Sequence, residues 1–108
     1  MIMKTYFTYI TTNNTDEAKI IGKALVSERL AACVNIVDGM HSLYWWENEI
    51  QEDHETILIA KTSESKLEKL ADRVKELHSY DCPCVVNLPI ENGNKDYINW
   101  IVEETNRD

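Results

Sequence analysis

Residues 33–62, CVNIVDGMHSLYWWENEIQEDHETILIAKT, decide the fold, because two strand-like runs flank a short polar turn. The first run extends from Cys33 to Trp46 and is interrupted at Asp38-Gly39, and the second returns from Ile50 to Thr62. Between them Glu47-Asn48-Glu49 predicts a tight turn, since asparagine tolerates a positive φ better than most residues. The sequence therefore predicts a long β-hairpin at the centre of the chain.

The segments before this hairpin predict a strand and a helix. Residues 2–12 alternate β-branched and aromatic side chains, which is typical of a strand. Asn14 followed by Glu17 resembles a capping box, and apolar residues recur after it at helical spacing. We expect this helix to reach about Leu30 or Ala31.

The segments after the hairpin predict a helix, a strand and a final helix. Ser65 with Glu68 is a second capping-box pattern, and an amphipathic run follows it until Asp81 and Pro83 stop the helix. Residues 84–90 then predict a fourth strand, and residues 97–102 a short last helix.

The resulting order, β-α-β-β-α-β-α, indicates the fold class. Its first six elements form the split βαβ, or ferredoxin-like, pattern, in which two helices pack on one face of a four-stranded antiparallel sheet. We therefore expect an α+β sandwich with a long central hairpin and an extra C-terminal helix. At 108 residues, the range 1–108 predicts a single domain.

Composition excludes several classes of partner. Eleven basic against 19 acidic side chains leave a net charge of −8, which argues against nucleic acid and against an anionic membrane surface. No stretch approaches the roughly 20 apolar residues of a membrane span, and no signal peptide is visible. Three cysteines make no disulfide framework. We expect reduced thiols and a cytoplasmic location.

The hairpin predicts self-association. Residues 33–46 would extend roughly 45 Å, whereas a compact chain of this length has a radius of gyration of about 13 Å. The tip places Tyr44 and Trp46 on one face and Trp45 on the other, which is a poor monomer surface. We expect an oligomer with Trp45, Trp46 and Trp100 in its interface. In the alternative, the aromatic side chains fold back onto the last helix of their own chain, near Trp100.

These motifs together resemble the CutA divalent-cation-tolerance family along nearly the whole chain. The matching stretches are residues 25–36, LVSERLAACVNI, residues 42–47, SLYWWE, and the later segments HSYDCP at 78–83 and NGN at 92–94, with Tyr97 and Trp100. The resemblance implies a ferredoxin-like homotrimer related in shape to PII signalling proteins. It also implies a role in the response to divalent metal ions such as copper, and it implies no defined enzyme reaction or organic cofactor.

One segment departs from the family pattern. The usual sequence His-Pro-Tyr-Glu-Val-Pro-Glu is replaced here by residues 78–84, HSYDCPC, so that Cys84 stands where the family has a glutamate. A carboxylate that serves a ligand or a subunit contact would be lost by this change. Asn48 replaces the usual turn glycine and can supply the same backbone angle.

The same segment provides the candidate metal ligands. Imidazole and thiolate are preferred ligands of copper and zinc, and His78, Cys82 and Cys84 lie close together in sequence, with Asp81 between them. In the alternative, both cysteines pack as small apolar residues at a strand start. Cys33 begins a buried strand; it is either a packing residue or a ligand that approaches thiols of another subunit.

A second group lies on the hairpin. With a turn centred on Asn48, His41 and His54 are expected to lie almost opposite one another, where they either bind a metal or remain solvated. The neighbouring acidic run predicts a solvated face. Its members are Glu47, Glu49, Glu52, Asp53 and Glu55.

A cleft between subunits is the last candidate site. By analogy with PII-type trimers, Tyr44, Trp46, Lys61 and Tyr80 would line it, which favours a sensor or adaptor for a small molecule or protein as the alternative function. An acylphosphatase-like enzyme is rejected, because the loop at residues 11–15, TTNNT, has neither the glycine nor the arginine of a phosphate loop.

Overall fold

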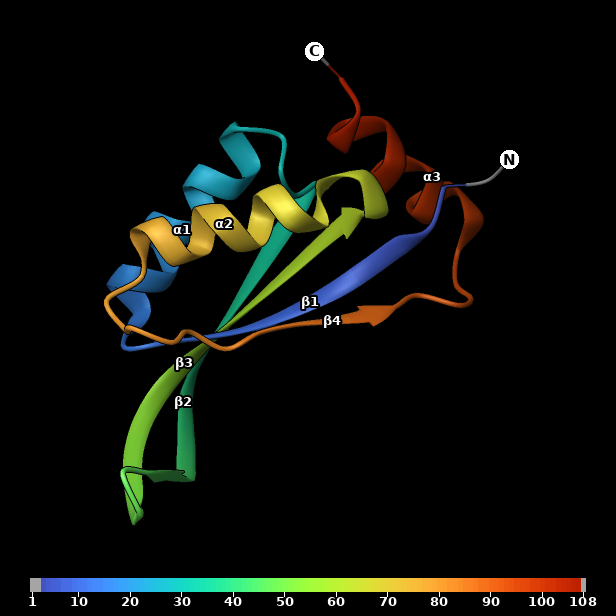
Figure 1. Ribbon diagram of the computed structural model, residues 1–108. Coiled ribbons are helices and arrows are strands. Elements are labelled where there is room, and N and C mark those ends of the chain that lie inside the picture. The colour runs from blue at the N-terminus through green and yellow to red at the C-terminus, as the bar shows by residue number, and fades with distance from the viewer. Residues whose placement is uncertain (1–2, 108) are drawn as a thin grey trace.

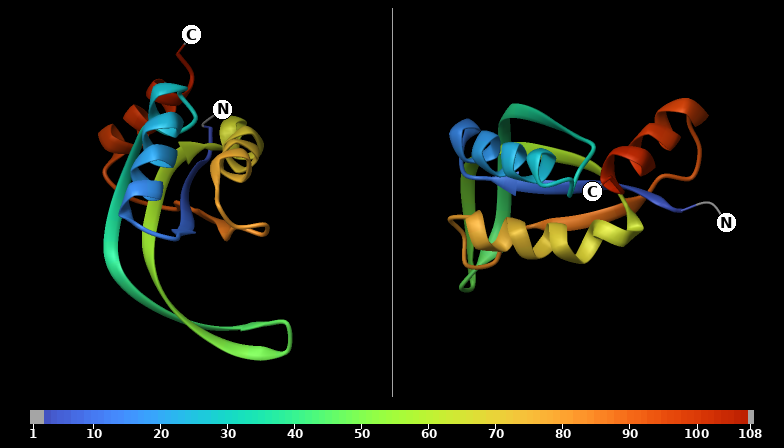
Figure 2. Two further views of the ribbon diagram at one scale, coloured as in Figure 1. Left: turned by 90° about the vertical axis from the view of Figure 1, so that its left-hand side faces the viewer. Right: turned by 90° about the horizontal axis from the view of Figure 1, so that it is seen from above.

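The computed structural model describes residues 3–107 and contains one four-stranded antiparallel sheet with the strand order β2-β3-β1-β4 (Figure 1). The strands are β1 (Thr5–Thr12), β2 (Cys33–Trp46), β3 (Glu49–Ser63) and β4 (Val85–Pro89). Helices α1 (Thr15–Ser27) and α2 (Leu67–Leu77) lie on one face, and α3 (Lys95–Thr105) lies near one end of the sheet (Figures 1 and 2). The predicted ferredoxin-like α+β fold is confirmed.

The core lies between the sheet and the first two helices. Ile10 of β1 is in register with Leu58 of β3, and both side chains are fully buried. Helices α1 and α2 cover them with Ile21, Leu25, Leu70 and Val74. Burial of each such side chain contributes about 1.5–3 kcal/mol, so this layer holds the sheet that carries the hairpin.

A β-bulge marks the place where the hairpin leaves the sheet. Asp38 and Gly39 lie between the pairs Val37–Ile57 and Met40–Glu55, so two residues of β2 face the single residue Thr56. Gly39 has φ = 81°, and an Asp38 carboxylate oxygen accepts bonds from the Gly39 N–H (2.8 Å) and the Thr56 hydroxyl (3.0 Å). The ribbon bends and projects beyond the body of the domain (Figure 2). The interruption predicted at residues 38–39 is confirmed.

The hairpin turn is tighter than expected. Strand β3 begins at Glu49, which leaves Glu47 and Asn48 as the two turn residues, with φ values of 50° and 65°. Positive φ at both central residues matches the right-handed twist of the strands. The predicted positive φ at Asn48 is confirmed, and Glu47 shares it.

Helix α1 begins as predicted but ends early. The Asn14 side chain accepts the Glu17 N–H at 2.8 Å. The helix stops at Ser27 rather than near Leu30, because Arg29 is left-handed with φ = 63°. The Leu30 N–H donates to the Leu25 carbonyl at 2.9 Å and the Arg29 N–H to the Val26 carbonyl at 3.1 Å, which is a Schellman ending.

The prediction of a second capping box at Ser65 and Glu68 was wrong. A short 3-10 turn, η1 (Glu64–Lys66), precedes α2, and the residue before the helix makes no side-chain cap. The Ser65 hydroxyl instead donates to the Asn106 side chain at 3.1 Å. Helix α2 ends at Leu77, and β4 is shorter than the predicted strand at 84–90. Residue 2, which belongs to the first predicted strand, lies outside the described residues.

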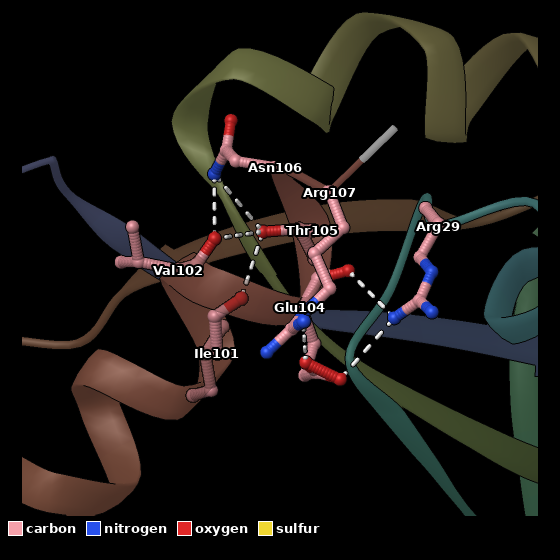
Figure 3. A network of polar contacts seen from close by, with 7 residues as sticks. All are labelled: Arg29, Ile101, Val102, Glu104, Thr105, Asn106 and Arg107. Atoms are coloured by element: carbon pink, nitrogen blue, oxygen red, sulfur yellow. Dashed lines mark hydrogen bonds and ion pairs between the residues drawn. The ribbon is translucent and has the colours of Figure 1, made fainter.

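Helix α3 is fastened to the end of the sheet by polar contacts. The Thr105 hydroxyl lies 2.7 Å from that of Ser63 on β3 and donates to the Ile101 carbonyl at 2.8 Å. Arg29 reaches across to Glu104 at 3.2 Å (Figure 3). Among the described residues, no helix is long and apolar enough to cross a membrane.

Candidate functional site

A cavity of about 770 Å³ lies between the base of the hairpin and the loop that connects α2 to β4. Aromatic rings, carboxylates and thiols share its wall. The lining residues are Tyr9, Thr11, Met40, His41, Ser42, Leu43, Tyr44, Trp46, Glu55, Ser79, Tyr80, Asp81, Cys82 and Cys84. Tyr44, Trp46 and Tyr80, predicted as cleft residues, are thus brought together.

Glu55 is the buried charge of this cavity. Its side chain accepts a hydrogen bond from the Tyr80 hydroxyl at 2.9 Å, and the residue is only 8% exposed. Burial, followed by the bond to Glu55, raises the pKa of Tyr80 far above its ordinary value. Tyr80 therefore stays protonated and acts as a donor to the carboxylate.

Sequence reasoning placed Glu55 in a solvated acidic face and missed its role. A turn centred on Asn48 would pair Tyr44 with Glu52 and turn Glu55 to the other face, whereas in the structure Tyr44 pairs with Gln51. Two steps of two residues then place Glu55 on the same face as Tyr44. The Tyr44 hydroxyl in turn donates to Asp53.

Lys61 does not join this group. Its ammonium donates to the Asn35 side chain at 2.8 Å and lies 5.6 Å from the centre of the Tyr97 ring. Cys33, which pairs with Lys61 across the sheet, lies 3.3 Å from the Tyr97 hydroxyl. These residues form a separate cluster under α3.

His78 holds the loop of the cavity in place. Its ring is fully buried; Nε2 donates to the Thr11 carbonyl at 2.7 Å, and Nδ1 accepts the Tyr80 N–H at 3.1 Å. Both nitrogens are therefore occupied, as a neutral imidazole allows. A metal would have to displace one of these bonds before His78 could bind it.

The two cysteines of the predicted metal set both reach the cavity. Cys82 is exposed and Cys84 is half-buried. Burial, helped by the nearby Glu55 and opposed by hydrogen bonding to Thr11, raises the pKa of the Cys84 thiol. Within residues 3–107, no three His, Cys, Asp or Glu side chains are grouped so that they could hold a metal ion. The complete ligand set, with Cys33 at the other end of the sheet, is not assembled in one chain.

The two hairpin histidines lie opposite one another, as predicted. His41 pairs with His54 across β2 and β3, and the ring centroids are 4.3 Å apart with an interplanar angle of 55°. Both residues are exposed.

The aromatic tip does not fold back on its own last helix. Trp45 and Trp46 are 71% and 51% exposed, and the tip projects away from α3 (Figure 1). Trp100 instead packs against Tyr97, with ring centroids 5.5 Å apart. The alternative that the tip contacts Trp100 within one chain was wrong.

The sheet face opposite α1 and α2 is apolar and partly open. Val37 pairs with Ile57 on this face, and Val86 pairs with Tyr9, which itself pairs with Ile59. Val37 and Val86 are 48% and 50% exposed. Exposed apolar side chains of this kind are more common on protein surfaces that other chains cover.

Comparison with known proteins matches this architecture over almost its whole length. A family model described as CutA1 divalent ion tolerance protein matches residues 6–104. The divalent-cation tolerance protein CutA of Thermus thermophilus is 50% identical over 96 residues, covering 89% of this chain and 93% of that protein. The chloroplastic protein CutA 1 of Oryza sativa is 47% identical over 97 residues, which cover 90% of this chain but only 55% of that protein.

A solved structure agrees. The crystal structure of CutA1 from Oryza sativa has a TM-score of 0.92 and 43% identity, and the match covers 98% of this chain and 96% of that one. The family model and the Thermus thermophilus protein are named for divalent-ion or divalent-cation tolerance rather than for a reaction.

Proposed function

This chain belongs to the CutA1 divalent ion tolerance family, and we propose that it acts in the response to metal ions by binding copper or a related metal such as zinc. It does so as a binding protein rather than as an enzyme, with no organic cofactor. Its proposed location is the cytoplasm, where thiols stay reduced.

The observation that carries this proposal is the pair of thiols on one cavity. Cys82 and Cys84 line it together, and the Glu55 carboxylate lies on the same wall. Thiolates are soft ligands that select copper and zinc over harder cations. Two thiolates and a carboxylate would complete a donor set only after the loop moves, because within residues 3–107 no three such side chains are already grouped around a metal position. His78 joins as a ligand only by releasing the Tyr80 N–H.

Metal uptake at this cavity must displace a thiol proton. Because the pKa of Cys84 is raised, its thiol is protonated at neutral pH. Metal binding releases that proton, so apparent affinity should increase as pH rises toward the raised pKa of Cys84.

We further propose that three copies assemble through the open sheet face and the hairpin. An open apolar face around Val37 and Val86 and the unpaired edges of the hairpin both need covering. Trp45, Trp46 and Trp100 would enter the interface. Cys33 would contribute to a metal site only if a neighbouring copy brought it beside Cys82 and Cys84.

Native mass spectrometry of the reduced protein with Cu(I) and Zn(II) tests both proposals. A trimer that takes up three metals is expected, and the Cys82→Ser/Cys84→Ser variant should lose them. Cys33→Ser is the matched single-thiol control, and His78→Ala tests the histidine. Equal loading of the double variant would refute the thiol site, and a monomer would refute the trimer.

A second candidate function is a sensor or adaptor of PII type that binds a small molecule. The size of the cavity favours it, since about 770 Å³ lies within the range of ligand pockets. In a trimer this cavity would face a neighbouring copy. Tyr44, Trp46 and Tyr80 would contact the ligand, and Lys61 would line another part of the same cleft. A ligand that raises the melting temperature without metal, in a screen of metabolites, would support this function.

A further inference from the structure

The two hairpin histidines differ from His78 in what their rings contact. Across residues 3–107, neither the His41 ring nor the His54 ring has a hydrogen bond to a protein group, whereas both nitrogens of His78 are occupied. Both hairpin residues are exposed. Their nitrogen lone pairs are therefore available to a ligand from solvent.

The distance between the rings allows a shared metal ion once each ring turns one nitrogen toward it. With metal–nitrogen bonds of about 2.0–2.1 Å, each ring centroid lies about 3.2 Å from the metal. Two imidazoles at 90° then have centroids about 4.5 Å apart, and at a tetrahedral angle about 5.2 Å apart. The observed 4.3 Å is closer to the first value. Among divalent first-row metals, a site with imidazole ligands binds Cu(II) most tightly, and Cu(II) and Ni(II) accept cis nitrogen ligands at 90°.

The backbone holds the two histidines in this relation. They are direct partners in the antiparallel ladder, so both side chains leave the same face of the ribbon. The pairs on either side, Met40–Glu55 and Ser42–Asp53, continue the register without a slip. Little conformational entropy is then lost when a metal bridges the rings.

The charge of the surroundings is also favourable. Glu52 leaves β3 on the same face as His54, two residues away, and the chain carries a net charge of −8. Acidic surroundings raise the local concentration of cations.

We propose that His41 and His54 form a cross-strand chelate for Cu(II) or Ni(II) at the base of the hairpin, with the other coordination positions open to water. This site is separate from the thiol cavity and deepens the proposed metal response, on which its biological role rests. Bridging the strands also stiffens the hairpin where it leaves the domain.

Isothermal titration with Cu(II), with electron paramagnetic resonance of the complex, tests the chelate. The Cys33→Ser/Cys82→Ser/Cys84→Ser background is used, because Cys33, Cys82 and Cys84 are all free thiols that could bind or reduce the metal. One Cu(II) per chain with two nitrogen ligands is expected. His41→Phe or His54→Phe keeps a ring in the cross-strand contact but removes a ligand. Each should weaken apparent affinity by about 10²-fold or more, because two-point binding is lost.

Matched controls separate the outcomes. Glu52→Gln removes a neighbouring charge but no nitrogen and should leave the spectrum unchanged. Absence of binding, or a spectrum and affinity unchanged in both histidine variants, would overturn the chelate. Loss of Cu(I) uptake in the thiol variant with an intact Cu(II) signal would support both the thiol site and this site. Cu(I) uptake by the thiols without any Cu(II) signal from the histidines would refute the histidine site and leave the thiol site intact.

Discussion

Replacement of Arg29 by glycine should leave the end of α1 more stable than replacement by alanine, since both variants lose the same ion pair. Arg29 has φ = 63°, a conformation that costs a side-chain-bearing residue about 1–2 kcal/mol. Glycine removes this cost but adds about 0.4–1 kcal/mol of freedom to the unfolded chain. The two effects leave glycine more stable than alanine at this position by roughly 0–1.6 kcal/mol, with a midpoint of about 0.8 kcal/mol.

The ion pair between Arg29 and Glu104 must also be counted when the stability of either variant is compared with that of the unaltered protein. Arg29 lies 3.2 Å from Glu104, and its side chain is 46% exposed (Figure 3). Exposed pairs contribute about 0–1 kcal/mol. Arg29→Ala loses the pair and keeps the backbone strain, so it should be the least stable of the three proteins.

Thermal and urea unfolding at one protein concentration measure these differences. A difference of 1 kcal/mol corresponds to about 4–8 °C in melting temperature for a domain of this size. The Glu104→Gln variant, alone and combined with each substitution, isolates the pair by a double-mutant cycle. If Arg29→Gly is no more stable than Arg29→Ala, the left-handed residue does not strain the helix end and the reasoning fails.

Three further predictions concern the hairpin and the loop of the cavity. Gly39→Ala should destabilise the fold by about 1 kcal/mol in urea titrations. A Cβ at this position would meet no atom within 4 Å, so the cost comes only from the positive φ of 81°; an unchanged midpoint would contradict the bulge geometry. Glu47→Asn should stabilise it by up to about 1 kcal/mol, since asparagine tolerates φ = 50°, whereas Glu49→Gln, which removes a charge outside the turn, should not. Burial opposes ionisation of Glu17, but hydrogen bonds from Ser79 and Asn13 and the nearby His78 outweigh it and lower the pKa of that carboxyl. Its stabilisation is therefore present above the ordinary glutamate pKa and is lost as pH falls through the lower folded value, so Glu17→Gln should flatten the acid limb of the stability profile, and an identical acid limb in both proteins would count against this linkage.

Sequence reasoning succeeded where the determining forces are local. Alternation of side chains, a cap at Asn14 and a turn at Asn48 act within a few residues, so the order of elements and the partnership of His41 with His54 followed from spacing. It failed at Arg29, because the left-handed end of the helix carries no glycine that would have indicated it. It also failed at Ser65, whose hydroxyl donates to the distant Asn106 side chain instead of capping a helix.

The candidate site depended on contacts between distant segments. Spacing placed His78, Cys82 and Cys84 together, yet only the packing of their loop against β1 showed that the His78 ring bonds to the Thr11 carbonyl. Likewise, only the folded chain showed Glu55 buried beneath Tyr80.

The sequence by itself determined the family, the strand and helix order and the long hairpin, because periodicity and turn chemistry are written in neighbouring residues. Tertiary structure alone decided which ligating groups are free. His78 is occupied by its hydrogen bonds, Cys33 lies at the opposite end of the sheet, and the His41 and His54 rings are open to solvent. The physical reason is that hydrogen bonding and burial are set by segments that meet only after the chain has folded.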